Sequence, residues 1–550
     1  MQRSRGSTRT SLLSWILAVV CIAGASHSIV AQTAVPGLAS IETIDSTPFL
    51  RIRQQAMDSS QVMDIVSWLS DVYGPRLTGS PSARTAAGWA MKEMKRWGLD
   101  NVRLENWGPF GRGWSNESFS LQAISPQHYP IIAYASAWTP GVSNSSNSPV
   151  TAEVVLAPLA NAADFAAYQA RYHGKLRGRF VMTEEPHALP QQFRADAMRF
   201  SDSTLSWMAA GSASGHPDPR AAVFAQMIAH HRARIALDQL RLRFLASEGA
   251  AAALIDGEGS DGTVTVESVG GSRDAGVPPL IPTVVLASED YGRLARTLQK
   301  GVPVTLQLED ENRFHDDNPG SFNIIAEIPG IDPQLKDEVV MIGAHFDSWH
   351  SATGAADNAA GSAVMMEAMR ILRAAHVQIR RTVRIALWTG EEQGMLGSRA
   401  YVTQHYADPT VMHLKPEDAK FDVYFNLDNG AGKIRGVFLQ GNAAAEPVFD
   451  KWMAPFKADG MRTLTLAKTG FTDFMSFDAV GLPGFQFIQD PLDYNTRAHH
   501  SNMDTYERVP SDDMKWNAMV IATFAMQAAN SAEMVPRKPL PAPAPFSMAP

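Results

Sequence analysis

The stretch GAHFDSWHSATGAADNAAGSA, residues 343–363, holds two histidines and two aspartates in a loop between two ordered segments. It overlaps the end of the apolar run EVVMIGA, residues 338–344, and it leads into AVMMEAMRIL, residues 363–372. The first run is typical of a buried strand, and the second has apolar residues at helical spacing. The loop therefore places His345 at a strand end and Asp357 before a helix. It is either a polar surface turn or half of a metal site.

Three further apolar runs extend the strand–helix pattern toward the C-terminus. They are FNIIAEI (322–328), TVRIALW (382–388) and FDVYFNLD (421–428). Helical periodicity is clearest in residues 358–375 and 511–529. Compact apolar strands that alternate with helices predict an α/β fold with a helix-covered sheet.

The region from about residue 120 to 315 has a different sequence pattern, with short β-rich runs, glycine-rich loops and one long helical segment at 225–249. We interpret it as a mostly β module inserted into the main domain. The predicted organisation is a signal peptide (1–31), an N-terminal segment of the main domain (32–119), the inserted domain (120–315), the main domain (316–533) and a proline-rich tail (534–550). The proline content predicts disorder for the tail.

The N-terminus has the pattern of a secretory signal: arginines precede the apolar run LLSWILAVVCIAGA, and cleavage is expected after Ala31. A membrane anchor is the alternative, but the run is short for a bilayer span and no later segment is long and apolar enough. We therefore expect an exported protein, in periplasm or medium, without a stable membrane span. The only cysteine, Cys21, lies inside the signal. A net charge of -8 argues against a nucleic-acid partner.

Acidic side chains follow two more of the predicted strands. Glu391 and Glu392 come just after residues 382–388, and Asp428 ends residues 421–428. Ligands of open α/β sheets bind at the carboxyl ends of strands, so these groups are expected to meet His345. A helix-capping role for Asp357 and a solvated acidic turn at Glu391 are the structural alternatives.

Clustered carboxylates repel one another unless cations neutralise them, which favours a metal site. A mature chain without cysteine must bind zinc through histidine and carboxylate, a ligand set that suits this ion. The segment RAHHSNMDTYE, residues 497–507, offers His499 and His500 as a second histidine.

The motifs HFD, AADNAAGSA, EEQGMLGS, NLDNG and HHSNMDT occur in an order that resembles the co-catalytic di-zinc exopeptidases, a family that includes bacterial aminopeptidases and glutamate carboxypeptidase. The resemblance covers most of the chain. GPRLTGSP (74–81) and the inserted region are most similar to the carboxypeptidase Q group. The resemblance implies a helix-covered mixed sheet of the zinc-exopeptidase type with a protease-associated-like domain, a peptide substrate and a homodimer.

The resemblance also implies a role for each site residue. His345 and Asp428 would hold one zinc ion, Glu392 and His500 the other, and Asp357 both. Glu391 would be the general base. Asp347 would accept a hydrogen bond from His345, and a cis peptide bond would follow Asp357.

His499 stands where glutamate carboxypeptidase has a tyrosine that stabilises the oxyanion. It is a candidate for that role, and it is also an alternative ligand to His500.

The expected activity is hydrolysis of dipeptides or short peptides by a water activated by two zinc ions. An aminopeptidase on the same scaffold is the alternative, and Arg435, Lys468 and Arg497 are candidates for contacting a substrate carboxylate. A receptor-like relative without activity is disfavoured, because every implied ligand and the base are present. A one-zinc glutaminyl cyclase is disfavoured because both His345 and Asp428 are present.

Overall fold

The computed structural model describes residues 46–142, 149–211, 219–267 and 270–547. The predicted signal peptide and Cys21 lie outside the described residues. Within the described part of the chain, no helix is both long and apolar enough to cross a membrane.

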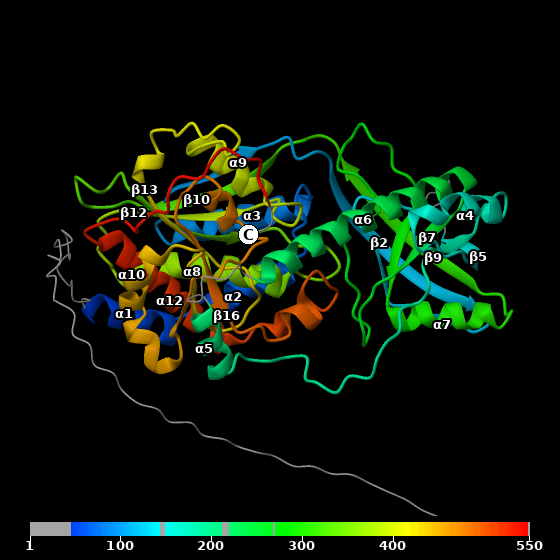
Figure 1. Cartoon of the computed structure of the whole chain (residues 1–550), viewed down its shortest axis with the longest axis horizontal. Helices are drawn as coiled ribbons and strands as arrows, with labels where there is room; N and C mark the ends of the chain where they lie inside the picture. Colours follow the sequence, from blue (N-terminus) through cyan, green and yellow to red (C-terminus); the bar gives the residue numbers. More distant parts are fainter. Residues whose placement is uncertain (1–45, 143–148, 212–218, 268–269, 548–550) are drawn as a thin grey trace, which may run out of the picture. The chain divides into compact units, whose positions relative to one another are not determined.

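The first sheet has eight strands in the order β1-β10-β12-β11-β13-β16-β14-β15. Figure 1 labels β10, β12, β13 and β16 of this sheet. Its strands are β1 (Asp100–Trp107), β10 (Ser321–Ile328), β11 (Val339–His345), β12 (Thr382–Trp388), β13 (Phe421–Asn426), β14 (Ile434–Phe438), β15 (Thr463–Thr465) and β16 (Gly484–Gln489). The central strands β12, β11, β13 and β16 are parallel to one another, whereas β1, β10 and β14 add antiparallel pairs. The prediction of a mixed sheet is confirmed.

Helices cover both faces of this sheet, because successive side chains of a strand point to opposite faces. Val340 and Ile342 of β11 belong to the core beneath α8 and α12, whereas Met341 belongs to the core beneath α9 and α11. The helices around the sheet are α1 (Ser46–Asp58), α2 (Val62–Ser67), α3 (Pro81–Arg96), α8 (Ala360–Ala374), α9 (Leu396–His405), α10 (Glu446–Trp452), α11 (Phe474–Asp478) and α12 (Ser511–Asn530). A strand buried on both faces appears in sequence as a continuous apolar run, which is why the prediction succeeded here.

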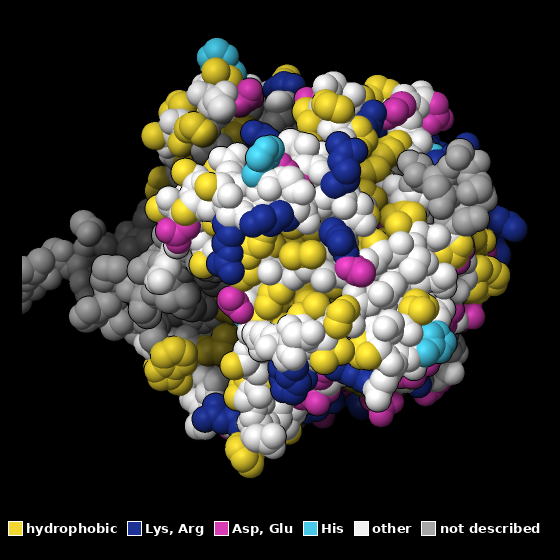
Figure 2. Space-filling model, turned by 90° about the vertical axis from the view of Figure 1, so that its right-hand side faces the viewer, with side chains coloured by type: hydrophobic (Ala, Val, Ile, Leu, Met, Phe, Trp, Pro, Cys, Tyr) yellow, Lys and Arg dark blue, Asp and Glu magenta, His cyan; other side chains and the backbone are white. Residues whose placement is uncertain are grey.

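The second sheet lies between residues 113 and 315 and has the order β3-β2-β9-β5-β6-β7-β8-β4. Its strands are β2 (Gly113–Ser125), β3 (Tyr129–Pro130), β4 (Ala133–Ala135), β5 (Val150–Leu156), β6 (Phe180–Met182), β7 (Ala252–Asp256), β8 (Thr283–Leu286) and β9 (Thr305–His315). The helices of this region are α4 (Phe165–Tyr172), α5 (Asp202–Gly211), α6 (Pro219–Glu248) and α7 (Ser288–Gln299). Figure 2 faces this region and shows apolar side chains near its centre, with Lys and Arg beside them.

Part of the predicted insertion packs against the first sheet instead. Leu205 of α5 shares a small core with Phe438 of β14 and Ile488 of β16. Arg199 forms ion pairs with Asp490 and Asp513, at 3.0 and 2.8 Å. The chain therefore crosses back to the first sheet within residues 120–315.

The proline-rich tail is ordered over residues 534–547, so the prediction of disorder is wrong there. Val535 is buried and donates its N–H to Asp422, at 2.7 Å. Arg537 binds the Asp418 carboxylate at 2.8 Å and two backbone carbonyl groups. Proline favours an extended chain, and these contacts fix that chain on the first sheet.

Candidate metal centre

The carboxyl ends of three neighbouring parallel strands carry most of the predicted site. His345 is the last residue of β11, Glu391 follows β12 and Asp428 follows β13. Asp357 lies in the turn Ala355–Ala359 that leads into α8. Because the strands are adjacent and point the same way, their polar ends meet at one edge of the sheet, as predicted.

His345 is at the centre of the first group of side chains. Its Nε2 atom lies 3.2 Å from Asp357 Oδ1 and 3.2 Å from Asp428 Oδ1. The candidate ligand atoms of these three buried residues all lie within 4.8 Å of one another. One nitrogen and two carboxylate oxygens therefore converge on a single position.

His500 completes a second group on the other side of Asp357. Its Nε2 atom lies 2.9 Å from Glu392 Oε2 and 3.7 Å from Asp357 Oδ2. The two oxygens of Asp357 thus face different histidines, which is the arrangement that a carboxylate shared by two cations needs.

The backbone around Asp357 is firmly held. The N–H groups of Ala356 and Asp357 donate to the carboxylate of Asp504, at 2.5 and 3.0 Å. The Asp357–Asn358 peptide bond is cis, as the family resemblance implies. The Asn358 side chain donates to the Leu427 carbonyl at 3.0 Å, which joins this turn to the segment that carries Asp428.

The motif GPRLTGSP holds the loop after β11. Arg76 is fully buried and donates to the backbone carbonyls of Phe346, Leu69, Thr353 and Gly354, at 2.7–3.1 Å. Burial lowers the pKa of Arg76 to about 10, and nearby carboxylates oppose that shift. Arg76 of this motif is therefore a buried cation whose hydrogen bonds hold the loop after β11 in place.

Asp347 has a different hydrogen bond from the one predicted. The Nδ1 atom of His345 lies 2.9 Å from the backbone carbonyl of Asp347 and 3.7 Å from its carboxylate, so the carbonyl is the acceptor. The carboxylate instead accepts from Thr78 Oγ1 at 2.8 Å and from the N–H groups of Gly390 and Glu391, at 3.0 and 3.3 Å. Asp347 thus positions the His345 ring and the Glu391 turn together.

The acidic groups differ in the direction in which their pKa values are shifted. Burial raises the pKa of Glu391 well above its usual value, and the nearby Asp428 and Asp473 charges add to the shift. Burial likewise raises the pKa of Glu392 to about 7, against the opposing charge of His500. Burial would raise the pKa of Asp357 as well, but the neighbouring histidines hold it below its usual value. Burial therefore disfavours the charged form of both Glu391 and Glu392, whereas the histidines favour the charged form of Asp357.

Two buried oxygens identify positions that a cation would satisfy. Among the described residues, Asp357 Oδ2 and Glu392 Oε1 have no hydrogen-bond partner. An unpaired buried carboxylate oxygen is costly, and the usual remedy is a hydrogen bond, an opposite charge or a metal ion. Two imidazole nitrogens with three carboxylates match the donor preference of zinc. The residues therefore fit a zinc site.

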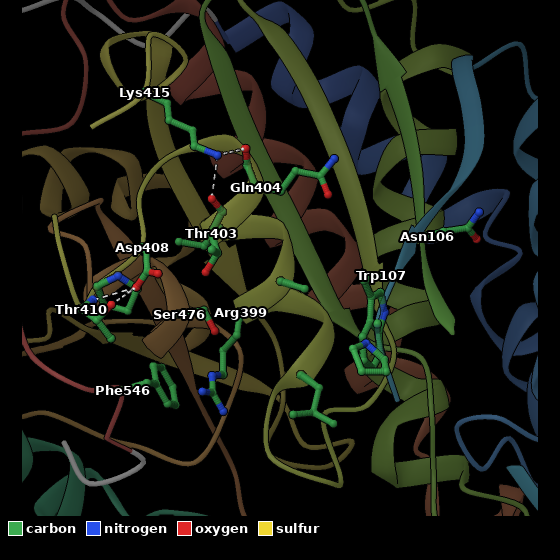
Figure 3. Close-up of a pocket in the computed structure, with 16 residues that line it drawn as sticks. Asn106, Trp107, Arg399, Thr403, Gln404, Asp408, Thr410, Lys415, Ser476 and Phe546 are labelled. Atoms are coloured by element: carbon green, nitrogen blue, oxygen red, sulfur yellow. Dashed lines mark hydrogen bonds between the residues drawn. The ribbon is translucent and has the colours of Figure 1, made fainter. Parts of the chain in front are cut away.

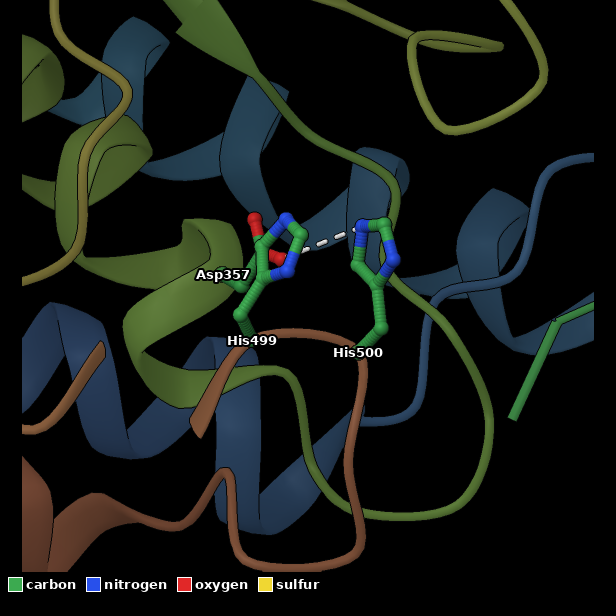
Figure 4. Close-up of side chains that lie close together, drawn as sticks. All are labelled: Asp357, His499 and His500. Carbon is green, nitrogen blue, oxygen red and sulfur yellow. Dashed lines mark ion pairs between the residues drawn. The ribbon is translucent and has the colours of Figure 1, made fainter. Parts of the chain in front are cut away.

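His499 lies directly against His500, as Figure 4 shows. The two rings stack with centroids 3.7 Å apart. Candidate ligand atoms of Asp357, His499 and His500 also lie within 4.8 Å of one another. His500 alone forms ion pairs with both Asp357 and Glu392, whereas His499 is the more exposed of the two. The ion pairs therefore favour His500 as the ligand, and His499 lies beside the same group of side chains.

Two of the three candidate contacts for a substrate carboxylate are already engaged. Arg435 binds Asp490 at 3.0 Å. Arg497 binds Asp196 at 2.8 Å and Asp261 at 2.6 Å. Lys468 is exposed. Both arginines therefore form ion pairs within the chain, which was not apparent from their positions in the sequence.

Sequence reasoning missed Asp473, which is fully buried at the residue before α11. Neither of its carboxylate oxygens has a hydrogen-bond partner among the described residues. Burial raises its pKa to about 8, with a contribution from the nearby Asp428 charge. The surrounding GFTDFMSF reads as an ordinary turn and short helix, so no sequence signal separates this aspartate from a capping residue.

A separate cavity of about 880 Å³ contains none of the predicted site residues (Figure 3). Its lining includes Trp107, Arg399, Lys415 and Phe546. The Lys415 ammonium donates to the carbonyls of Thr403 and Gln404, and Arg399 lies over the ring of Phe546. The chemistry of the metal centre is therefore not shared with this cavity.

Comparison with known proteins gives consistent matches. Residues 323–525 match the model of peptidase family M28, a span that includes every predicted metal ligand. Carboxypeptidase Q of Mus musculus is 25% identical over 473 residues, which cover 85% of this chain and 86% of that protein. A peptidase M28 precursor from Shewanella amazonensis has a TM-score of 0.62 at 24% identity and covers 90% of this chain and 99% of its own. A zinc aminopeptidase from Bacillus subtilis has a TM-score of 0.50 at 20% identity, over 84% of this chain and 93% of its own.

Proposed function

We propose that this chain, whose residues 323–525 match the model of peptidase family M28, is a zinc-dependent metallo-exopeptidase that uses two zinc ions to hydrolyse dipeptides or short peptides. The observation that carries the proposal is the position of Asp357, whose two carboxylate oxygens face His345 and His500 at 3.2 and 3.7 Å. Each histidine also faces a further carboxylate. Two adjacent ligand sets that share one aspartate are what a two-ion site requires.

Five side chains would hold the metal ions. His345 and Asp428 would bind one, Glu392 and His500 would bind the other, and Asp357 would bind both. Zinc bound there supplies the Lewis acidity that polarises a peptide carbonyl and makes water a stronger acid. Asp504 and Arg76 hold the turn and the loop on which these ligands sit.

Glu391 is proposed as the general base. Its raised pKa suits a group that takes a proton from water and passes it to the leaving amine. The N–H of Glu391 donates to the Asp347 carboxylate, and the Asp347 carbonyl accepts from His345. Asp347 therefore fixes the positions of Glu391 and His345 relative to each other. His499 is proposed to donate a hydrogen bond to the substrate oxygen that becomes negative during the reaction.

Carboxypeptidase activity is the leading specificity, since the chain aligns with carboxypeptidase Q over 85% of its length. Aminopeptidase activity is the alternative, and one observation favours it: Arg435 and Arg497 are engaged with aspartates and are not free to meet a substrate carboxylate. Lys468 is then the remaining candidate of the three.

The test is a hydrolysis panel on the purified protein, together with its zinc content. A carboxypeptidase cleaves an N-acetylated dipeptide and leaves a C-amidated one intact, and an aminopeptidase shows the opposite pattern. Two zinc equivalents per chain are expected. A well-folded protein that binds no zinc and cleaves neither substrate contradicts the proposal.

We also propose an exported protein that acts as a homodimer, with residues 120–315 as a protease-associated-like region. The apolar run at residues 12–25 supports export, and the short β-rich runs of residues 120–315 support the protease-associated-like region; the homodimer rests on the family resemblance of the motifs alone. Sedimentation of the mature protein and sequencing of its N-terminus after secretion test these points.

A further inference from the structure

Residues 260–267, which we call the strap, connect the second sheet to the metal centre. The strap belongs to the connection between β7 and β8, and its residues Val264 and Val266 are buried in a core with Ile255 and Val285 of those strands. The same segment forms an isolated β-bridge, Thr265 to Ser501, with the loop that carries His500. The strap is thus anchored in the second sheet and paired with the metal-site loop.

Backbone hydrogen bonds hold this loop on either side of Ser501. The N–H of Val266 donates to the carbonyl of His500 at 2.9 Å, and the N–H of Asn502 donates to the carbonyl of Val264 at 3.0 Å. The Asn502 side chain adds two bonds, since its oxygen accepts from Val264 at 2.7 Å and its amide donates to Gly262 at 3.0 Å. His500 therefore cannot shift without breaking its pairing with the strap.

Arg497 fastens the other end of the strap. Its guanidinium donates to the carbonyl of Ser260 at 2.6 Å, to Thr263 Oγ1 at 2.8 Å and to Asp261 Oδ2 at 2.6 Å. The Arg497 side chain is only 10% exposed, whereas its partner Asp261 is 66% exposed, so the bonds to Ser260 and Thr263 are the better shielded from water. Residues 497–502 and the strap consequently behave as one bonded unit.

The last residue of the strap contacts the His500 ring itself. Glu267 Oε1 lies 3.3 Å from Nδ1 of His500, on the ring edge opposite the Nε2 atom that faces Glu392. His345 is arranged the same way, with Nδ1 toward the Asp347 carbonyl and Nε2 toward the other ligands. A metal-binding histidine commonly donates its second N–H to a carboxylate or carbonyl, which fixes the tautomer and orients the ring.

We propose that Glu267 is a positioning residue for His500, and that through the strap the second sheet controls the affinity of the second metal position. The inference rests on the proposed function. Glu267 accepts the Nδ1 proton of His500, leaves Nε2 free to bind zinc and raises the basicity of the ring through its charge. The predicted insertion is then a structural part of the metal centre, although it lies outside the residues that match the family model.

The experiment measures zinc retention by the full chain in a graded series of chelator concentrations. The variants are Glu267→Ala, Glu267→Gln and Glu267→Asp. Loss of a carboxylate partner of a metal-binding histidine typically costs about 10- to 100-fold in metal affinity. We expect Glu267→Ala to lose one of two zinc ions at a chelator concentration lower by about that factor, and to hold the other as the wild type does. Glu267→Gln should be intermediate, and Glu267→Asp should recover part of the loss.

The matched control is Glu311→Gln, an exposed glutamate on β9 of the same sheet, which should retain zinc as the wild type does. Activity supplies a second measurement: kcat of Glu267→Ala should fall at low free zinc and recover when zinc is added. If Glu267→Ala holds both ions as tightly as the wild type, the inference is wrong and the proposed function stands. If the folded wild type itself binds fewer than two ions, both fail. Circular dichroism of each variant establishes folding, and Glu267→Gln keeps the test valid if the alanine variant unfolds.

Discussion

The sharpest test of the chemistry is Glu391→Gln. The substitution keeps the size of the side chain and leaves the N–H that donates to Asp347 in place. It removes only the capacity to take and release a proton. A positioned general base contributes about 10²- to 10⁴-fold to a rate, which corresponds to about 3–5 kcal/mol of activation free energy. We therefore expect kcat to fall by about that factor while KM changes little.

The metal content separates a lost base from a lost ligand. Among the described residues the Glu391 carboxylate forms no ion pair with His345 or His500, whereas Glu392 Oε2 lies 2.9 Å from His500 Nε2. Glu391→Gln should therefore retain two zinc ions, and Glu392→Gln should lose affinity for one. The assay is steady-state hydrolysis with zinc measured on the same samples, and the surface variant Glu311→Gln reports the effect of a neutral change.

The same substitution makes a prediction for the metal-free protein. The pKa of Glu391 is raised in the folded state above its ordinary value of 4.5, so the folded chain binds more protons than the unfolded chain once the pH exceeds that value. The folded state is therefore destabilised as the pH rises from 4.5 toward the raised pKa of Glu391 in the folded chain. Metal-free Glu391→Gln lacks this loss, so its melting temperature should exceed that of the wild type at neutral pH and match it near pH 4.5. Near-normal kcat in a variant that still holds two zinc ions would refute the assignment of the base.

Three further changes probe the framework of the site. Asp357→Ala should abolish binding of both zinc ions, measured by metal analysis, because its two oxygens serve both positions; full retention of either ion contradicts the bridging role. Asp473→Asn should raise the melting temperature of the metal-free protein at about pH 8 and have little effect near pH 4, since burial raises the pKa of that carboxyl from 3.8 to about 8. Arg537→Ala removes the bonds to the Asp418 carboxylate and to two backbone carbonyls and should lower the free energy of unfolding by about 1–3 kcal/mol in a urea titration; no change would show that Arg537 does not contribute to stability.

The sequence predicted the central strands well because their environment is uniform. The run at residues 382–388 coincides with β12, and the run at 338–344 lies within one residue of β11. Strands covered by helices on both faces must be apolar throughout, so their limits are visible without knowledge of their neighbours. The convergence of His345, Glu392 and Asp428 followed from the direction of parallel strands.

The contacts that depend on folded proximity were not predictable. The tail is ordered through Val535 and Arg537, whose partners Asp422 and Asp418 lie 113 and 119 residues away. The acceptor of the His345 N–H is a backbone carbonyl, and every residue has one, so side-chain identity gives no indication of it. The ion pairs of Arg435 and Arg497 likewise depend on aspartates that are distant in sequence or belong to another region.

Glu267 makes the same point for function. It lies 233 residues from His500 along the chain, in a segment that reads as one more polar loop of a β-rich region. Sequence motifs identify residues that could bind a metal ion directly. A carboxylate that contacts only the ligand histidine has no motif of its own. The metal affinity of a histidine depends on the orientation of its ring, and the residue that orients His500 lies outside the segment that matches the family model. If the strap holds the His500 ring, then changes in residues 120–315 alter metal affinity without altering a single metal ligand, and variants of that region should be assayed for zinc before they are assayed for substrate.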